Sequence, residues 1–137
     1  MHIITELVKP RRRLNQNSMI VGVGIDIVEI ERIKKALDKH GFSKRFFTEE
    51  EQKMSGNKVV MLADNFAVKE AVSKALGTGV RGFVLKDIEV LRDELGKPYV
   101  NLYGGALDIY NNLNAKNIQV SISNTDTISQ AICIIEK

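Results

Sequence analysis

Between residues 66 and 76, apolar side chains recur with the period of an α-helix. The stretch consists of good helix formers and holds neither proline nor glycine, and Gly77 and Gly79 follow it where a helix end belongs. At about 100° per residue, its apolar side chains fall on one broad arc. These side chains are Val68, Ala71, Val72, Ala75 and Leu76. The pattern therefore predicts a helix over Phe66–Leu76 with a wide buried face.

Two charged residues, Glu70 and Lys74, lie one turn apart on this helix and border its apolar arc. One interpretation is a solvated ion pair that contributes about 0.2–0.5 kcal/mol. The other is a ligand site, because the neighbouring apolar residues are mostly small and allow a close approach. The Gly-Thr-Gly at residues 77–79 favours the second interpretation, since glycine lets a ligand reach the backbone.

Residues 20–27 alternate in a way that predicts a strand. One side carries β-branched residues at positions 21, 23, 25 and 27, and the other carries Gly22, Gly24 and Asp26. Alternate glycines weaken a strand unless something needs the space. Two alternatives stay open: a glycine-rich edge with Asp26 at a turn, or a ligand site at Asp26 with cleared approaches. The run is not a dinucleotide-binding fingerprint, because the third glycine is absent.

The remaining patterns extend this picture to the whole chain. The other predicted elements are a helix over Val28–Lys39, a helix start at Thr48 with Glu51 closing a capping box, strands over Phe83–Leu91 and Tyr99–Leu102 joined by a turn at 93–98, a helix over Gly104–Ala115, and strands over Ile118–Ser123 and Ala131–Ile135. In the strand over 118–123, Gln119, Ser121 and Ser123 share one face. Early helices followed by strands that can pair antiparallel predict an α+β fold, with helices packed on an antiparallel β-sheet.

Composition narrows the class of protein. The chain has 137 residues, which suits one domain with a real core. Its apolar share is 44%, and no apolar run approaches the ~20 residues that a membrane span needs. The single cysteine, Cys133, excludes a disulfide framework and a paired-cysteine metal site. We therefore expect a cytoplasmic protein that has no membrane partner.

The net charge of +3 comes from the first 18 residues. Of the 20 basic and 17 acidic residues, four basic ones (Lys9 and Arg11–Arg13) and one acidic one (Glu6) lie there, so residues 19–137 hold 16 of each. Residues 1–18 do not join the pattern that follows, and we expect them to be a mobile extension to a single domain over residues 19–137. The balanced charge of that domain argues against a nucleic-acid partner, for which one triple-arginine run is weak evidence.

Basic residues gather on and just after the predicted helix over residues 28–39. Between residues 29 and 45 the basic side chains outnumber the acidic ones. The basic residues are Arg32, Lys34, Lys35, Lys39, Lys44 and Arg45. A solvated helix face is one interpretation, and a docking face for an acidic partner is the other.

Four stretches carry a more specific signal: residues 24–33 (GIDIVEIERI), 66–79 (FAVKEAVSKALGTG), 93–98 (DELGKP) and 120–123 (VSIS). Together they resemble the motifs of the holo-acyl-carrier-protein synthases, which are small-type 4′-phosphopantetheinyl transferases. The resemblance covers Met19–Lys137. It is highly specific, because a Phe-Ala-x-Lys-Glu-Ala motif is followed at a fixed distance by Lys-Ala-Leu-Gly-Thr-Gly.

The resemblance implies an enzyme that transfers the 4′-phosphopantetheine arm of coenzyme A to a serine of apo-acyl carrier protein, releases adenosine 3′,5′-bisphosphate, and supports fatty acid biosynthesis. It implies a Mg²⁺ site at Asp26 and Glu70, and two carboxylates suit a cation that also takes water and substrate phosphates. Lys74 is implied as a third catalytic residue that contacts phosphate or the incoming hydroxyl. The serine proton would go to a metal-bound water or to Glu70.

Family members are trimers that hold coenzyme A between adjacent subunits, so the resemblance also implies a homotrimer. The residues expected to bind coenzyme A are Ser73, Lys74, Gly77, Pro98, Ser123 and Asn124, with Pro98 and residues 122–124 supplying a facing wall. Because acyl carrier proteins are acidic and helical, we expect the carrier protein to dock on the basic helix, where Arg32, Lys35 and Lys39 are the predicted contacts.

Two positions depart from the family's pattern. Asn65 stands directly before Phe66, where a basic residue is common, and Asn124 follows residues 121–123, where histidine is common. Both changes remove possible phosphate-contacting groups, so they bear on the affinity for coenzyme A. The alternative function is a non-catalytic trimeric binding module that retains the fold. The three intact residues expected to act in catalysis argue against that alternative.

Overall fold

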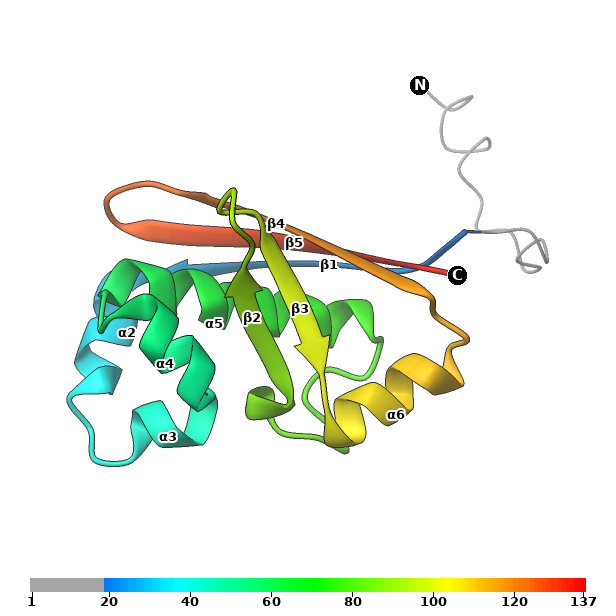
Figure 1. Ribbon diagram of the computed structural model, residues 1–137, viewed down its shortest axis with the longest axis horizontal. Helices are drawn as coiled ribbons and strands as arrows, with labels where there is room; N and C mark the ends of the chain where they lie inside the picture. The colour runs from blue at the N-terminus through cyan, green and yellow to red at the C-terminus, as the bar shows by residue number, and fades with distance from the viewer. Residues whose placement is uncertain (1–18) are drawn as a thin grey trace, which may run out of the picture.

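The structure is a computed structural model that describes residues 19–137, and the extension expected over residues 1–18 lies outside them. The described residues confirm the α+β prediction: a long helix lies beneath an antiparallel sheet with strand order β1-β5-β4, and β2 and β3 form a separate antiparallel pair (Figure 1). The elements are β1 (Ile20–Glu29), α2 (Ile30–Leu37), α3 (Phe42–Phe46), α4 (Glu49–Ser55), α5 (Val59–Ala75), the 3-10 turn η1 (Leu85–Asp87), β2 (Ile88–Arg92), β3 (Pro98–Leu102), α6 (Gly104–Asn112), β4 (Asn117–Asn124) and β5 (Ile128–Glu136).

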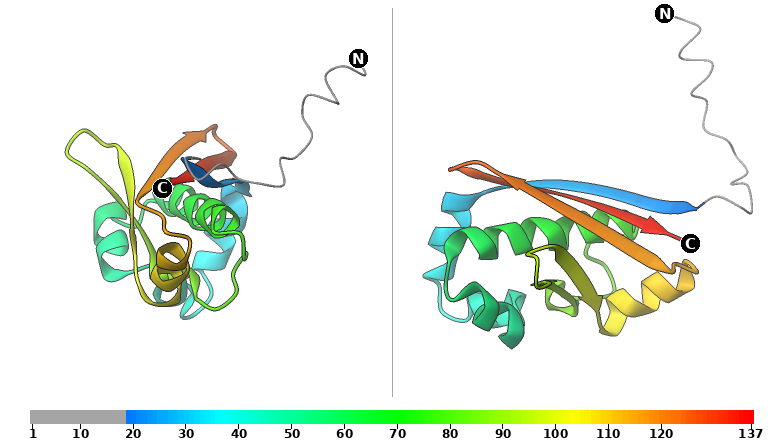
Figure 2. Two further views of the ribbon diagram at one scale, coloured as in Figure 1. Left: turned by 90° about the vertical axis from the view of Figure 1, so that its right-hand side faces the viewer. Right: turned by 45° about the horizontal axis from the view of Figure 1, so that its top comes forward.

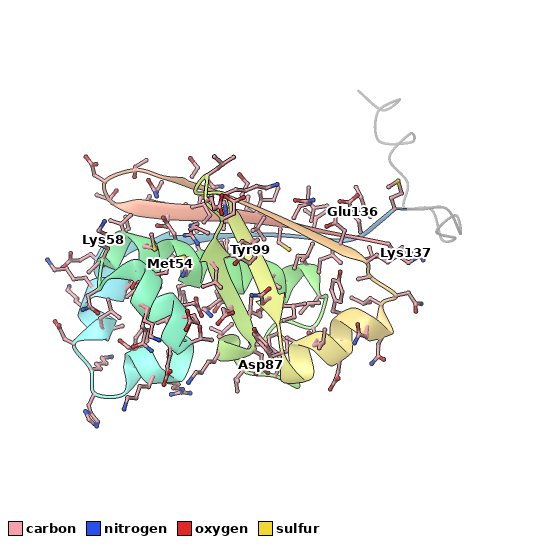
Figure 3. The ribbon with its side chains drawn as sticks, in the orientation of Figure 1. Met54, Lys58, Asp87, Tyr99, Glu136 and Lys137 are labelled. Carbon is pink, nitrogen blue, oxygen red and sulfur yellow. The ribbon has the colours of Figure 1, made fainter. Side chains whose placement is uncertain are left out.

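Helix α5 is the centre of the fold and is buried on nearly all sides (Figure 2). Its predicted apolar arc is buried as expected, and it packs against residues of β2, β5 and α6, among them Ile88, Cys133 and Ala106. The helix begins at Val59 rather than at Phe66, because residues 59–65 hold no helix breaker and continue the same buried surface. Lys58, which precedes it, and Glu136, at the end of β5, lie at opposite ends of the molecule (Figure 3).

The glycines of β1 make room for the backbone of α5. A Cβ atom on Gly22 would lie 1.9 Å from the carbonyl oxygen of Ala75, and one on Gly24 would lie 1.8 Å from that of Ala71. The space expected for a ligand is therefore occupied by the helix. Of the two alternatives for Asp26, the one that placed it at a turn is wrong, because Asp26 lies within β1 and pairs with Ala131 of β5.

The opposite face of β1 is exposed and apolar. Val23, Ile25 and Ile27 are 57%, 52% and 61% exposed, and Ile132 on the neighbouring strand β5 is 38% exposed. Val21 does not follow this row; a register shift between Ile20 and Gly22 turns it toward the core. The sheet therefore buries the face that carries the glycines and Asp26, and leaves its β-branched row in contact with solvent.

Two predicted element boundaries differ from those in the structure, because pairing between strands decides where a strand begins or ends. The expected helix start at Val28 is wrong: Val28 and Glu29 still pair with Ser129 and Ile128 of β5, so α2 begins at Ile30. Likewise, the strand expected over Phe83–Leu91 begins only at Ile88, because η1 precedes it.

The capping box at the start of α4 is confirmed. None of the helices in residues 19–137 has the length and apolar character that crossing a membrane requires.

Candidate active site

Asp26 and Glu70 come from different elements and line the same pocket. Asp26 projects from the inner face of β1, and Glu70 projects from the middle of α5. The pocket has a volume of about 350 Å³, and Arg32 of α2 together with the stacked rings of Phe42 and Phe66 also lines it. Sequence alone singled out both carboxylates, and the fold brings them together.

The electrostatics of this pocket favour a bound cation. Partial burial raises the pKa of Glu70 above its usual value, the negative charge of Asp26 raises it further, and the positive charge of Lys74 opposes both effects. Two carboxylates that share a half-buried pocket repel each other until a cation offsets their charge. The site therefore has the character of a binding place for a positive ion.

Lys74 contacts Asp26, and not Glu70 as in the first of the two interpretations of the sequence. Its Nζ lies 3.2 Å from Oδ1 of Asp26 and donates to the carbonyl oxygen of Ile25 at 2.9 Å. The Lys74 side chain is 54% exposed, whereas that of Asp26 is 18% exposed. The ammonium group thus stands at the mouth of the site, where it can reach an incoming anion.

The donor set fits Mg²⁺. Within residues 19–137 no group of three or more histidine, cysteine or acidic side chains converges on a metal position. A pair of carboxylates is nonetheless the protein contribution that Mg²⁺ commonly takes, because the ion retains waters and binds substrate phosphates. Asp26 and Glu70 are the residues that would hold it.

The residues expected to bind coenzyme A lie in three places. Ser73 is buried in α5 and donates its hydroxyl to the carbonyl oxygen of Lys69 at 2.7 Å, while Gly77 is exposed just after the helix. Pro98 begins β3 next to the β2–β3 turn, which projects from the body of the molecule (Figure 2). Pro98 does not line the pocket of Asp26 and Glu70.

Ser123 and Asn124 lie on opposite faces of β4. Ser123 is exposed on the outer face, where it lines a hollow with Ile25 and Gln130. Asn124 points inward and donates to the carboxylate of Asp64 in α5. Its amide group is therefore engaged within the subunit.

Position 65 also points into the interior. Asn65 is buried and donates through Nδ2 to Oε2 of Glu51 at 3.2 Å and to the carbonyl oxygen of Val90 at 3.1 Å. Asn65 therefore does not line the pocket of Asp26 and Glu70.

Sequence analysis missed a buried ionic network beside the site. Lys69 and Glu51 form an ion pair of 2.7 Å with both side chains fully buried, and Lys69 also donates to the carbonyl oxygens of Leu85 and Ile88. Burial raises the pKa of Glu51 and lowers that of Lys69, and the attraction between the two charges opposes both shifts. The signal available was the lysine next to Glu70 on the predicted buried helix.

The predicted carrier-docking residues are all on the surface. Arg32 and Lys35 are exposed on α2, and Lys39 is exposed in the turn after it. Arg32 borders the pocket of Asp26 and Glu70, so this basic surface is continuous with the candidate active site.

Comparisons with known proteins identify the family of this chain. A sequence profile described as the 4′-phosphopantetheinyl transferase superfamily matches residues 22–131. The chain is similar to the holo-[acyl-carrier-protein] synthase of Clostridium botulinum strain Alaska E43 (Type E3), with 54% identity over 125 residues that cover 86% of this chain and 98% of the relative. For the synthase of Lachnoclostridium phytofermentans the identity is 48% over 118 residues, covering 86% and 97%.

Solved structures give the same result. The crystal structure of Helicobacter pylori holo-[acyl-carrier-protein] synthase in complex with coenzyme A matches with a TM-score of 0.75 and 30% identity, covering 82% of this chain and 98% of that one. The chain therefore belongs to the 4′-phosphopantetheinyl transferase superfamily. Within it, the chain belongs to the family of the holo-[acyl-carrier-protein] synthases.

Proposed function

We propose that this protein transfers the 4′-phosphopantetheine group of coenzyme A to a serine of apo-acyl carrier protein and releases adenosine 3′,5′-bisphosphate. The observation that carries the proposal is the meeting of Asp26 and Glu70 in one pocket, with Lys74 at its mouth. These three residues come from the two stretches that resemble the family's motifs. The names of the relatives, and the coenzyme A bound to one of the similar structures, support the choice of substrates.

Mg²⁺ is the proposed cofactor, held by Asp26 and Glu70. When bound, it would offset negative charge on the pyrophosphate of coenzyme A and on the leaving group. Burial and the negative charge of Asp26 raise the pKa of Glu70, and a cation bound between the two carboxylates would oppose both effects.

The side chain of Lys74 is proposed to bind the reacting phosphate. In the transfer, the serine hydroxyl gives up its proton to Glu70 or to water, its oxygen forms a bond to the phosphorus that carries the pantetheine arm, and the bond from that phosphorus to adenosine 3′,5′-bisphosphate breaks. Negative charge is spread over the phosphoryl oxygens in this step, and a positioned ammonium group stabilises it. The exposed Nζ of Lys74 can exchange its contact with Asp26 for a phosphate oxygen.

We also propose a homotrimer with coenzyme A between subunits. The exposed row of Val23, Ile25 and Ile27 on β1, continued by Ile132 on β5, is an apolar surface of the kind that a second copy of the chain covers. The hollow beside it contains Ser123, so a ligand at such an interface would contact this strand. Gly77 of one subunit would then face Pro98 and Ser123 of the next.

The donors of Ser73 and Asn124 are satisfied within the subunit, by Lys69 and Asp64 respectively. We therefore propose that these two residues support the coenzyme A site from behind. The carrier protein is proposed to dock on Arg32, Lys35 and Lys39. Modification of acyl carrier protein would serve fatty acid biosynthesis, in the cytoplasm.

The proposal is tested by mass spectrometry of an apo-acyl carrier protein incubated with this protein, coenzyme A and Mg²⁺. The expected result is a mass increase of one phosphopantetheine group, which disappears when the carrier serine is replaced by alanine. An unchanged carrier mass at high protein concentration would reject the transferase and leave the non-catalytic binding module.

A further inference from the structure

The carboxylate of Asp64 joins helix α5 to both strands of the β4–β5 hairpin. Its Oδ1 and Oδ2 accept hydrogen bonds from Nδ2 of Asn124 at 3.0 and 3.1 Å, and Oδ1 also accepts one from Oγ of Ser129 at 2.6 Å. Asn124 and Ser129 face each other as the last pair of the β4–β5 ladder. We call this set of three side chains the Asp64 clamp.

Asp64 and Ser129 of the clamp are buried, whereas Asn124, at the end of β4, is exposed. Asp64 is 8% exposed and Ser129 is 0% exposed. A buried carboxylate is costly unless donors surround it, so the contacts with Asn124 and Ser129 hold these side chains in one arrangement. Arg92 of β2 lies near enough for its half-buried guanidinium to be attracted by the Asp64 carboxylate.

The clamp lies next to the row of the sheet that carries Asp26. Asn124 and Ser129 stand two residues from the paired residues Ile122 and Ala131, and Ala131 pairs in turn with Asp26. Residues two apart on a strand share a face and are separated by about 6.6 Å. On α5, Asp64 precedes Glu70 by six residues, or about 9 Å along the helix axis. The clamp therefore joins helix and sheet beside the two carboxylates.

Helix α5 is held on the sheet from both directions. Beyond Asp26, the close contact of Gly24 with the carbonyl oxygen of Ala71 fixes the approach of helix and strand. On the other side, the Asp64 clamp fixes it by hydrogen bonds. Asp26 and Glu70 lie between these two attachments, so their separation depends on both.

We infer that Asp64 and Asn124 are positioning residues of the transferase site. Their contact sets the separation of Asp26 and Glu70, and it holds Ser123, the neighbour of Asn124, on the outer face of β4. This inference rests on the proposed function and deepens it. It assigns to Asn124 an action through Asp64 in place of direct contact with coenzyme A.

The test is an exchange of the two clamp residues. Asn124→Asp places two carboxylates against each other, and Asp64→Asn removes the charged acceptor. Each single variant is expected to raise both the Mg²⁺ concentration for half-maximal rate and the KM for coenzyme A about tenfold, as loss of a supporting hydrogen bond does at metal sites. The double variant re-forms an amide–carboxylate pair in reverse order, with Ser129 donating to the new amide oxygen. It is expected to recover to within about threefold of the parent.

Asn112→Asp, the same change at an exposed position of α6, is the matched control and leaves both constants unchanged. Thermal melting of all five proteins accompanies the kinetics. Two outcomes would overturn the inference. One is single variants that melt at a lower temperature but keep the parent's Mg²⁺ requirement and KM for coenzyme A, which would show a merely structural contact. The other is a double variant in which neither quantity recovers.

Calorimetric binding of Mg²⁺ and coenzyme A to the same proteins separates this inference from the proposed function. A parent protein that transfers nothing would reject the transferase. The pattern of loss and recovery in the binding constants would still decide for or against the clamp.

Discussion

The carbonyl oxygen of Ala71 occupies the position that a side chain on Gly24 would take. A Cβ atom built there lies 1.8 Å from that oxygen, and the obstacle is helix backbone that cannot rotate away. Because Asp26 follows Gly24 on β1 and Glu70 precedes Ala71 on α5, this contact controls the approach of the two carboxylates as well as the packing of the core.

Gly24→Ala is therefore expected to destabilise the protein and impair the site together. Overpacking of a core costs about 1–3 kcal/mol, and contact with backbone places this change at the upper end. Chemical denaturation gives the free energy of unfolding, and the Mg²⁺ requirement of the remaining folded enzyme gives the effect on the site. Normal stability together with a normal Mg²⁺ requirement would show that β1 and α5 approach less closely than described.

The buried pair of Lys69 and Glu51 is expected to behave unlike an ordinary surface ion pair. Lys69→Met leaves the Glu51 carboxylate buried without its cation, which costs about 3–5 kcal/mol. Adding Glu51→Gln removes the unpaired charge, so the double variant should lose less than the sum of the two single losses. Urea unfolding of the three variants measures this coupling.

The chain offers a matched control in Lys53 and Glu50, whose exposed side chains are 3.6 Å apart. Lys53→Met breaks that pair and should cost between about 0 and 1 kcal/mol. Equal losses for Lys53→Met and Lys69→Met would contradict the buried network.

Removal of either carboxylate of the proposed metal site should abolish transfer while the fold persists. Asp26→Ala and Glu70→Ala are each expected to lower kcat/KM by at least about a hundredfold, because the cation no longer offsets charge on the reacting phosphates. Chelation of divalent ions should have the same effect on the parent protein, reversed by added Mg²⁺. Initial rates over a range of Mg²⁺ concentrations measure both.

Asp108→Ala removes an exposed carboxylate on α6 and is the control for this pair of variants. Near-normal turnover of either the Asp26 or the Glu70 variant at low Mg²⁺ would remove the metal assignment.

Lys74→Met should separate catalysis from stability. The contact of Lys74 with Asp26 is half-exposed, so its loss should change the free energy of unfolding by less than about 1 kcal/mol. The rate of transfer should fall severely, since the reacting phosphate loses its ammonium partner. Single-turnover kinetics and urea unfolding test the two halves; a large stability loss with retained turnover would assign Lys74 a structural role.

Charge reversal on the basic surface should affect the carrier protein, and at Lys35 and Lys39, which do not line the pocket of Asp26 and Glu70, it should spare coenzyme A. Arg32→Glu, Lys35→Glu and Lys39→Glu are expected to raise the KM for acyl carrier protein and weaken its dependence on salt. The reason is that exposed charges mainly assist encounter and are screened over about 8–10 Å at physiological salt. Kinetics at low and high salt measure the effect, with Lys116→Glu, near the start of β4, as control. If the triple variant kept the parent's KM for acyl carrier protein and its salt dependence, the carrier protein would bind at another surface.

Local pattern was sufficient for the features that depend on neighbours in sequence. The apolar arc of α5, the alternation of β1 and β4 and the capping box at Thr48 each follow from spacing alone. The same alternation placed Ser123 on one face of β4, and so already implied that Asn124 points to the other. Both acidic residues of the candidate site were found in this way.

Features that depend on distant partners could not be predicted. The glycines of β1 signalled a close approach, but only the packed fold shows that helix backbone fills the space beside Gly24. Lys69 gave no sign of its partner Glu51, which lies 18 residues earlier and was recognised only as a helix cap. The start of α2 was misplaced because Val28 is held in the strand by Ser129, which lies 101 positions later.

The pairing of β1 with β5 has a consequence for folding during synthesis on the ribosome. Strand β1, among the first described residues to be made, finds its sheet partner in β5, residues 128–136. Until β5 has emerged, Asp26 lacks the strand beside it, and the glycine row has no sheet in which to receive α5. Contacts so distant in sequence form slowly, because a long loop must close first. The nascent chain should therefore stay without an assembled active site until β5 has left the ribosome.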